Sequence, residues 1–503
     1  MFFKQKIDLS AIIGNAGILL YVPSLMTFFS LPIALFFKEY FAILPLLVTG
    51  IVTSILGYVF YRACFRSKKI HLWDAMLSAA LGWIFCPIVG AIPYLWISYS
   101  LASNGESNSA LEAISTPLNA FFETFSGFTS TGLTMIKEPA KLPHILQWWR
   151  AFTQWVGGVG LVVFVISFLH PSEGESRLFY AETRYKELGK SLLESGRMIW
   201  LIYSIYSLIF IGLFFITGMP LWESICHTLS AISTGGFTIS SHSFAEYSPL
   251  IKKLTIVLMV IGAMSFTIHY KLLFERKFSS LWKDIQNRVL FIFFVVGSIL
   301  VYLFAFPYFD SLDATFQWVT SLATCGFSTK NLSVLHPLIK VFLVVGMVIG
   351  GSSGSTVGGI KVRRVIFLWQ AIILRLKSFT LKKEKKVLEE SKLLEPTGVD
   401  LPEGRKTERL YEASILFTLW MFSLAIGWTL LSLFLPNLNG TDLLFEVSSA
   451  LSNVGLSVGI VGPGISSAAK LVFIFIMWVG RLEVIPILIL FLSPFVALSK
   501  NKS

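Results

Sequence analysis

The chain has 503 residues, of which 54% are hydrophobic and 14% charged, and its mean hydropathy is +0.72. This composition excludes a soluble globular protein of this length and predicts an all-α polytopic membrane protein. The formal net charge is +12, but the basic residues gather between apolar segments. That distribution favours a role in membrane topology, with contact to anionic lipid headgroups, over nucleic-acid binding.

Ten long apolar segments are predicted to cross the membrane as helices. They lie near residues 9–30, 41–61, 74–100, 147–169, 198–218, 251–273, 286–306, 338–376, 410–435 and 468–498. Residues 1–6 are a charged start without a small-residue cleavage site, so no removable signal peptide is predicted.

Basic residues follow the second, fourth, sixth and eighth spans, which share one side of the membrane with both termini if ten spans are correct. The positive-inside rule makes that side cytoplasmic. The residues are Arg62, Arg66, Lys68, Lys69, Arg177, Arg184, Lys186, Lys190, Lys271, Arg276, Lys277 and Lys283, followed by the basic stretch 361–409. Within that stretch, residues 381–409 mix lysine and glutamate clusters with two prolines, which predicts a solvated cytoplasmic linker.

Four short loops between the apolar segments share one pattern, a glycine followed by Leu or Phe and then Thr or Ser. Four copies of one loop in a membrane chain predict a pseudo-fourfold pore, in which backbone carbonyls replace the hydration shell of a monovalent cation. The central glycine permits the φ values that such a loop needs, and the loops hold no acidic residue of the kind that binds divalent cations. The predicted filter residues are Ser130, Thr131, Gly132, Leu133, Thr234, Gly235, Gly236, Phe237, Thr324, Cys325, Gly326, Phe327, Asn453, Val454, Gly455 and Leu456.

Polar residues precede each loop glycine at helical spacing. Counting 13, 9 and 6 residues back gives Asn119, Glu123 and Ser126; Glu223, His227 and Ser230; Asp313, Gln317 and Thr320; and Asp442, Glu446 and Ser449. Offsets of i, i+4 and i+7 place each set on one helix face. We therefore expect four half-membrane pore helices of about twelve residues, roughly 18 Å long. The first residue of each set is the expected N-cap, with Glu223 the poorest. A polar stripe that binds soluble neighbours is the alternative interpretation.

A second set of glycines, Gly157, Gly262, Gly350 and Gly480, follows 24 to 26 residues after the loop glycines. Small residues let membrane helices approach closely or bend. The predicted unit is outer helix, pore helix, filter loop and inner helix, repeated four times around a central pore. The predicted domains are an N-terminal two-helix hairpin (1–70), pore repeats 1 (71–170), 2 (171–273) and 3 (274–377), a cytoplasmic linker (378–408) and pore repeat 4 (409–503).

The eighth span is interrupted by ten residues rich in glycine and serine. Non-helical backbone at membrane depth is tolerated only inside protein or along water, so we expect this segment to lie in the pore below the filter as a gate. The predicted gate residues are Gly350, Gly351, Ser352, Ser353, Gly354, Ser355, Thr356, Val357, Gly358 and Gly359. A phosphate-binding loop is the alternative, but Ile360 separates Gly359 from Lys361, and the context is not strand, loop and helix.

Arg481, directly after Gly480, completes the predicted gate. An arginine inside a membrane needs partners and usually a function, and carbonyls of the glycine-rich segment are the expected partners. An arginine that snorkels to the membrane interface is the alternative. Glu483 is two residues away on a helix and is not expected to face Arg481.

The remaining chemistry-bearing residues predict no enzyme and no bound cofactor. The histidines form no metal set, no HExxH, CxxC or nucleophile motif occurs, and the four cysteines (Cys64, Cys86, Cys226 and Cys325) predict no disulfide framework.

Several motifs resemble those of the TrkH/KtrB/HKT superfamily of potassium transporters, and the TrkH type most closely. They occupy residues 90–94 (GAIPY), 121–128, 149–158, 233–237 (STGGF) and 350–361 (GGSSGSTVGGIK), and the resemblance covers nearly the whole chain. The two N-terminal spans also resemble the TrkH type, because KtrB-type proteins lack them. In plant relatives, serine at the first filter glycine goes with sodium preference, so Gly132 resembles the potassium-conducting kind.

The resemblance implies potassium bound at the filter residues and a homodimer in which each chain holds its own pore. It also implies a cytosolic TrkA-type nucleotide-binding subunit that opens or closes the pore, in the bacterial cytoplasmic (inner) membrane. Two modes stay open, a gated potassium pore and a symporter that couples potassium to sodium or protons. A non-transport membrane protein, such as a sensor, is a more distant alternative.

Overall fold

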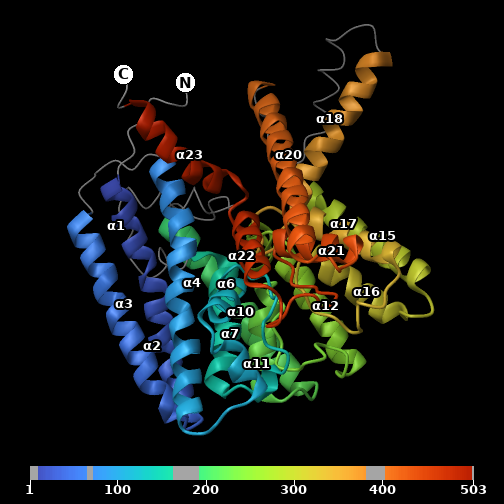
Figure 1. The fold of residues 1–503 in the computed structure, drawn as a ribbon. Helices are drawn as coiled ribbons and strands as arrows, with labels where there is room; N and C mark the ends of the chain where they lie inside the picture. Colours follow the sequence, from blue (N-terminus) through green and yellow to red (C-terminus); the bar gives the residue numbers. More distant parts are fainter. Residues whose placement is uncertain (1–8, 65–71, 162–191, 381–402, 501–503) are drawn as a thin grey trace.

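The computed structural model describes residues 9–64, 72–161, 192–380 and 403–500, and all regular structure in these ranges is helical (Figure 1). Six of the described helices are long and apolar enough to cross a membrane, or eight if each of two bent pairs is one span. Two predicted spans fall outside this count because α7 (His144–Val159) has 16 residues and α17 (Pro337–Ile349) has 13. The predicted basic segments at 66–69 and 177–190 lie outside the described residues.

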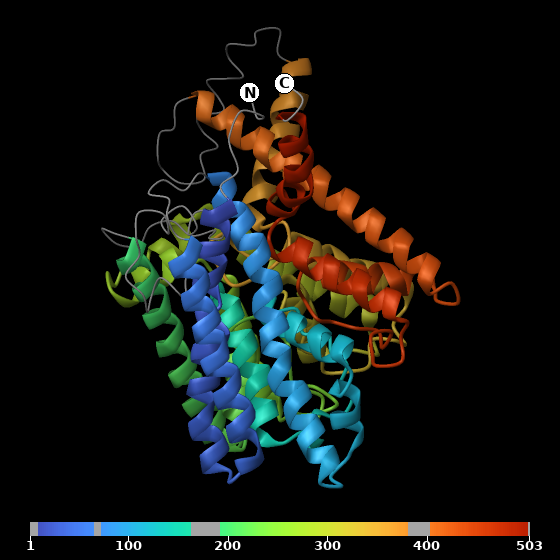
Figure 2. The same cartoon turned by 60° about the vertical axis from the view of Figure 1, so that its left-hand side comes forward.

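The N-terminal helices form a side layer against the rest of the chain. α1 (Leu9–Leu19) and α2 (Tyr21–Phe36) pack on α3 (Ile43–Cys64), and α1 also packs on α4 (Leu72–Ser103) (Figure 2). Gly17 and Gly57 lie face to face where α1 crosses α3, so that a Cβ on either glycine would meet the carbonyl oxygen of the other. Small residues at a crossing allow the close backbone approach that stabilises helix pairs in lipid.

Four helices have twelve residues each and are labelled in Figure 1. They are α6 (Pro117–Phe128), α11 (Leu221–Ile232), α16 (Ser311–Leu322) and α21 (Gly440–Leu451). This is the predicted length, and each helix leads into one of the four glycine loops. Such a helix spans only about 18 Å, so it reaches part of the way through a hydrocarbon core of about 30 Å.

The predicted N-caps of these short helices were wrong by one turn. Asp313 and Asp442 lie in the first turn of their helices, and the capping side chains are Asp310 and Asn439, three residues earlier. Thr116 and Pro220 precede the other two helices without a side-chain cap. Aspartate is stabilising in the first turn as well as at the N-cap because both positions meet the positive end of the helix dipole, so residue type alone did not fix the register.

Four helices lead away from the loops: α7, α12 (Pro249–Ala263), α17 and α22 (Ser467–Arg481). Two predicted straight spans are sharply bent. α12 meets α13 (Phe266–Leu273) at 107°, and α22 meets α23 (Ile485–Lys500) at 113°. At the first bend the Ser265 side chain caps α13, and at the second Glu483 and Val484 have positive φ. Both halves of each bent pair are apolar, so hydropathy could not reveal the break.

The outer helices are α10 (Leu192–Ile216), α15 (Ile285–Ala305) and α20 (Glu403–Phe434). α18 (Val362–Thr380) and α20 project at the upper end of Figure 1, where α1 begins and α23 ends. α18 continues to Thr380 and α20 begins at Glu403, so helices occupy both ends of the predicted linker 378–408. The short helices are α5 (Ser109–Ile114), α14 (Ser280–Lys283), η1 (Tyr40–Ala42) and η2 (Pro139–Lys141).

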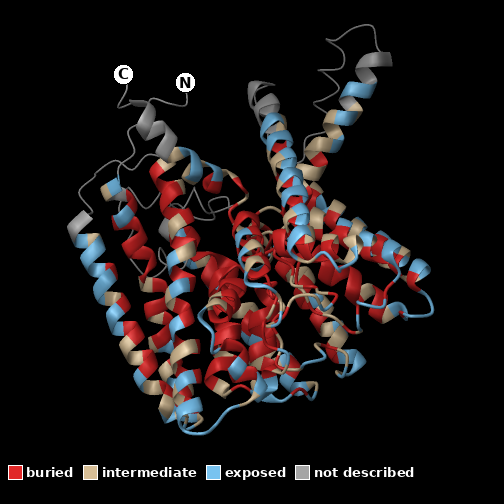
Figure 3. Cartoon of the chain, in the orientation of Figure 1, coloured by how far each residue is buried: buried red, intermediate tan, exposed pale blue. Residues whose placement is uncertain are grey.

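Burial increases from the outer helices to the centre (Figure 3). Apolar side chains on α3, α15 and α20 are exposed, among them Ile55, Val295 and Phe422. The central short helices instead bury polar side chains, including Glu123, His227, Gln317 and Glu446. An apolar exterior around a polar interior is the pattern of a membrane protein with a central hydrophilic path.

Candidate functional site

The four glycine loops meet in a closed ring in the centre of the molecule. A Cβ on Gly132 would overlap the carbonyl oxygen of Gly235, and the same relation holds between Gly236 and Cys325, Gly326 and Val454, and Gly455 and Thr131. Each loop therefore touches the next, and the fourth touches the first. The predicted filter residues are brought together, and at each glycine any side chain would displace backbone of a neighbouring loop.

The backbone of each loop alternates in handedness. The four ring glycines have φ between +83° and +91°, and the residues two positions earlier, Ser130, Thr234, Thr324 and Asn453, have φ between +45° and +54°. The residue between them is outside the positive-φ set. Left-handed backbone at a non-glycine residue costs about 1–3 kcal/mol and persists only where its surroundings enforce it.

A shared helix cap enforces this conformation. The N–H of the residue before each ring glycine donates to the carbonyl of the hydroxyl residue five positions earlier, at 2.8–2.9 Å; the pairs are Thr131 to Ser126, Gly235 to Ser230, Cys325 to Thr320 and Val454 to Ser449. With the left-handed residue in between, this is the Schellman arrangement that satisfies the last carbonyls of a helix. The cap offsets the strain and links the loop geometry to the end of the short helix.

In loop 1 (residues 130–133) and loop 4 (residues 453–456), the glutamate nine residues before the ring glycine holds the chain where it leaves the loop. Glu123 accepts hydrogen bonds from the Thr134 hydroxyl (2.9 Å) and the Met135 N–H (2.8 Å). Glu446 accepts from the Ser457 hydroxyl (2.6 Å) and the Val458 N–H (2.9 Å). The corresponding His227 accepts from the Ile239 N–H at 3.4 Å. The sequence predicted this polar face, and a hydroxyl residue eleven positions after each glutamate was the available clue to its partner.

Loop 3 (residues 324–327) is held differently. Gln317, at the position of Glu123 and Glu446, is buried with neither side-chain polar atom hydrogen-bonded in the described structure. The chain leaving this loop is bonded to the chain leaving loop 2 (residues 234–237) instead: Ser328 N–H donates to the Ser243 hydroxyl at 3.1 Å, and Phe244 N–H donates to the Ser328 carbonyl at 2.9 Å.

α7 supplies two polar side chains, Arg150 and Gln154, that are not among the predicted site residues. Arg150 donates from Nε to Glu123 Oε1 at 2.8 Å and from Nη1 to the Thr238 carbonyl at 2.9 Å, and its guanidinium lies 4.2 Å from the centroid of the Phe237 ring. The Arg150 and Glu123 side chains are 3% and 0% exposed. Gln154, one turn later, contacts the loop 2 backbone. This face of α7 therefore links loop 1 (residues 130–133) to loop 2.

The predicted gate is non-helical and lies directly against the ring. Residues 350–361 separate α17 from α18, with positive φ at Gly350, Gly354, Gly359 and Lys361. Gly358 N–H donates to the Thr324 hydroxyl at 2.8 Å, and a Cβ on Gly358 would overlap the Ser452 carbonyl. The segment therefore touches both loop 3 and the residue preceding loop 4 (residues 453–456).

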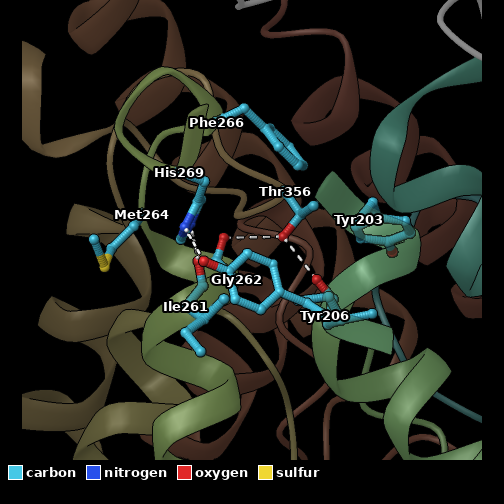
Figure 4. Close-up of a pocket in the computed structure, with 9 residues that line it drawn as sticks. Tyr203, Tyr206, Ile261, Gly262, Met264, Phe266, His269 and Thr356 are labelled. Atoms are coloured by element: carbon cyan, nitrogen blue, oxygen red, sulfur yellow. Dashed lines mark hydrogen bonds between the residues drawn. The ribbon is translucent and has the colours of Figure 1, made fainter. Parts of the chain in front are cut away.

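The bend between α12 and α13 supports the same segment from outside. The single Thr356 hydroxyl proton is within hydrogen-bond reach of the Gly262 (3.1 Å) and Ile232 (3.2 Å) carbonyls, and Phe266 N–H donates to the Gly354 carbonyl at 2.8 Å. A small cavity lies beside Thr356, lined in part by Tyr203, Tyr206 and His269 (Figure 4). The hydroxyl of Tyr206 is 3.0 Å from His269 Nδ1. The predicted gate segment is thus packed against the ring, and its Thr356 borders this small cavity.

Arg481 bonds to carbonyls at the end of α7, an element that the sequence did not indicate as its partner. Its Nη2 donates to the Gly157 carbonyl and, at 3.1 Å, to the Gly158 carbonyl, and its guanidinium lies 5.1 Å from the centroid of the Trp83 ring. These carbonyls are at the C-terminal end of α7, where the helix dipole attracts a cation. Glu483 forms an ion pair with Arg364 of α18 at 2.5 Å.

Two glycines of the second set allow α7 and α22 to pack closely on the ends of the short helices. A Cβ on Gly157 would overlap the carbonyl oxygen of Phe128 at the end of α6, and a Cβ on Gly480 would overlap that of Leu451 at the end of α21.

The remaining candidates are structural. Among the described residues no group of His, Cys, Asp and Glu could hold a metal ion. Cys86, Cys226 and Cys325 are buried and are not joined to one another in a disulfide. The Cys325 thiol donates to the Ala231 carbonyl at 3.7 Å, so this side chain packs behind the ring.

Comparisons with known proteins are consistent with this geometry. The model of the TrkH family, described as a cation transport protein, matches residues 91–498. An uncharacterized cation transporter of Methanocaldococcus jannaschii is 31% identical over 490 residues, which cover 97% of this chain and 96% of the relative. The Trk system potassium uptake protein TrkH of Salmonella typhimurium is 28% identical over 471 residues, which cover 89% of this chain and 91% of the relative. The crystal structure of the potassium transporter TrkH from Vibrio parahaemolyticus matches with a TM-score of 0.80 at 25% identity, covering 97% of this chain and 100% of that one.

Proposed function

The chain belongs to the TrkH family of cation transport proteins, and from this premise we propose that it takes up potassium across the cytoplasmic membrane through the ring of four loops. The observation that carries the proposal is the closure of the ring, in which each of the four ring glycines faces a carbonyl of a neighbouring loop. The named function of the Salmonella relative, potassium uptake, agrees with it. The six to eight apolar spans make the chain a multi-pass membrane protein.

The proposed ion ligands are backbone carbonyls of residues 130–133, 234–237, 324–327 and 453–456. Alternating positive and negative φ turns successive carbonyls toward the same side, which suits coordination of a dehydrated cation. The loops themselves carry no carboxylate, and the buried Glu123 and Glu446 accept hydrogen bonds from the chain that leaves each loop. This arrangement favours a monovalent over a divalent cation, because Ca²⁺ and Mg²⁺ sites generally include carboxylate ligands.

The proposed gate is the segment 350–359 together with Arg481. The segment contacts the ring through the Gly358 N–H, which donates to the Thr324 hydroxyl, and through the Thr356 hydroxyl, 3.4 Å from the Thr234 hydroxyl. We propose that the segment obstructs the path below the filter in this conformation. Displacement of the segment would open the pore. Arg481 joins the ends of α22 and α7, and we propose that this joint favours the closed arrangement.

The proposed assembly is a homodimer with one pore in each chain, regulated by a cytosolic TrkA-type nucleotide-binding subunit. α18 and α20 support a docking role because they project at the end where α1 begins and α23 ends (Figure 1). That end would face the cytoplasm, with its basic residues near anionic lipid headgroups. Substitution of the basic residues on α18 should weaken copurification of the subunit, and an unchanged complex would contradict the docking proposal.

The test of the proposed function is flux in proteoliposomes that contain the purified protein, with and without the regulatory subunit. We expect potassium flux into the vesicles to be larger than sodium flux. A reversal potential that follows the potassium gradient alone indicates a pore, and one that shifts with imposed sodium or proton gradients indicates the symport alternative. Absence of any potassium flux, together with failure to restore growth of a potassium-uptake-deficient strain, would contradict the proposal.

A further inference from the structure

The side-chain amide of Gln154 is hydrogen-bonded to loop 2 on both sides of the ring glycine. Gln154 Nε2 donates to the Gly235 carbonyl at 2.5 Å, and Gln154 Oε1 accepts from the Phe237 N–H at 3.1 Å. These two groups belong to the peptide planes before and after Gly236. Gln154 itself is 0% exposed, so water does not compete for either bond.

The other three pore repeats have no glutamine at the position that corresponds to Gln154. It lies three residues before Gly157, and the residues three positions before Gly262, Gly350 and Gly480 are Met259, Met347 and Met477. The ring shows a matching asymmetry. The residues that precede the ring glycines are Thr131, Gly235, Cys325 and Val454, so a second glycine is present only in the loop that Gln154 contacts.

Packing explains why the two features occur together. A Cβ on Gly235 would overlap the Cδ, Oε1 and Nε2 atoms of Gln154. The amide therefore occupies the space that a side chain fills in the other loops. Gly235 is not among the glycines of positive φ, so its backbone conformation alone does not require glycine.

A pair of consecutive glycines leaves the intervening peptide with few steric restraints, because neither residue carries a Cβ. The Gly235 carbonyl is also the one that packs against Gly132 of loop 1. Rotation of this peptide would move one of the four carbonyls that close the ring. In the structure, the two bonds from Gln154 oppose that rotation, and Arg150, one turn earlier on α7, holds the next part of the chain through the Thr238 carbonyl at 2.9 Å.

We propose that Gln154 is a specificity-determining positioning residue, which fixes the Gly235–Gly236 peptide and thereby sets the potassium preference of the ring. The inference rests on the proposed function, since it assumes that the ring is the ion path. It assigns the selectivity of loop 2 to a side chain on α7, outside all four loops. Gln154 acts through the loop backbone and need not touch the ion.

The test compares the potassium-to-sodium permeability ratio of full-length wild type, Gln154→Met and Gln154→Asn in proteoliposomes, measured under bi-ionic conditions. Met is the residue at the corresponding positions, and Asn keeps the amide but is too short to make both bonds. The matched control is Gln147→Met, the same substitution two turns earlier on α7, where the amide bonds to the Leu142 carbonyl and the Trp222 indole. Thermal unfolding of each purified protein reports whether it folds.

We expect Gln154→Met and Gln154→Asn to lower the permeability ratio by about fivefold, the factor that corresponds to one net hydrogen bond, and Gln147→Met to leave it unchanged. Adding Gly235→Cys to Gln154→Met should recover part of the ratio, because the new side chain restrains the freed peptide. A folded Gln154→Met or Gln154→Asn protein with the wild-type ratio would overturn the inference. A wild-type protein that conducts no potassium would instead overturn the proposed function, so the two failures are distinguishable.

Discussion

Alanine at Gly455 should disrupt ion selectivity, whereas alanine at Gly459 should leave it intact. Both glycines have left-handed backbone, with φ of +91° and +93°, so each substitution adds similar backbone strain of roughly 1–2 kcal/mol. They differ in what a new Cβ meets. At Gly455 it overlaps the carbonyl oxygen of Thr131, and at Gly459 no heavy atom lies within 4 Å.

The overlap at Gly455 sets the expected magnitude. Ordinary contact requires the Thr131 carbonyl to move by about 1 Å, whereas the groups of a functional site must be held within roughly 0.5 Å. Selectivity that depends on carbonyl positions should therefore weaken by at least about tenfold, which corresponds to ~1.4 kcal/mol of lost discrimination. Gly459→Ala carries the backbone strain without that displacement.

The assay is the potassium-to-sodium permeability ratio in proteoliposomes, with thermal unfolding of each variant as the control for folding. We expect both variants to fold, with a lower unfolding temperature for Gly455→Ala because of the overlap, and a reduced ratio or no conduction for Gly455→Ala alone. Equal ratios in the two variants, whether both normal or both reduced, would show that the close approach of Thr131 and Gly455 does not control selectivity.

Four further predictions concern the gate, the buried ion pair and the first loop. Arg481→Gln should raise potassium flux without the regulatory subunit, because it removes a charged link between α22 and α7; reduced flux in a folded variant would contradict the gate assignment. Thr356→Val should also raise unstimulated flux, since it removes the bonds that hold the gate segment at the α12–α13 bend, and unchanged flux would show that those bonds do not restrain it. Glu123→Gln should cost about 3–5 kcal/mol of stability by leaving the Arg150 charge buried without its partner, as measured by thermal unfolding, with partial recovery on adding Arg150→Gln; an unaltered unfolding temperature would mean that the charge is neutralised elsewhere. Gly132→Ser should reduce the preference for potassium over sodium, and an unchanged permeability ratio would remove loop 1 from the filter.

Helical spacing and the glycine pattern were enough to predict the four short helices and the break in the eighth span. The offsets of polar residues before each loop glycine predicted four short helices of about twelve residues, and the structure has helices of that length leading into all four loops. The break in the eighth span was predicted because each glycine destabilises a helix relative to alanine. These features are local, so they could be read from neighbouring residues in the chain.

The sequence did not predict contacts between residues that are far apart in the chain. Arg150 meets Thr238 across 88 positions, and Gln154 meets Gly235 across 81; neither residue type nor spacing identifies such a partner. The same limit explains Arg481, whose Gly157 and Gly158 partners are more than 300 positions away. Hydropathy also missed the bends after α12 and α22, because the chain is apolar on both sides of each bend.

The central claim is that the cation passes through the ring of four loops, and anomalous diffraction tests it most directly. Crystals of the protein soaked with rubidium or thallium, which substitute for potassium, should show anomalous density on the axis of the ring, within coordination distance of carbonyls of residues 130–133, 234–237, 324–327 and 453–456. Density confined to another site, in a protein that conducts the same ion in liposomes, would contradict the account.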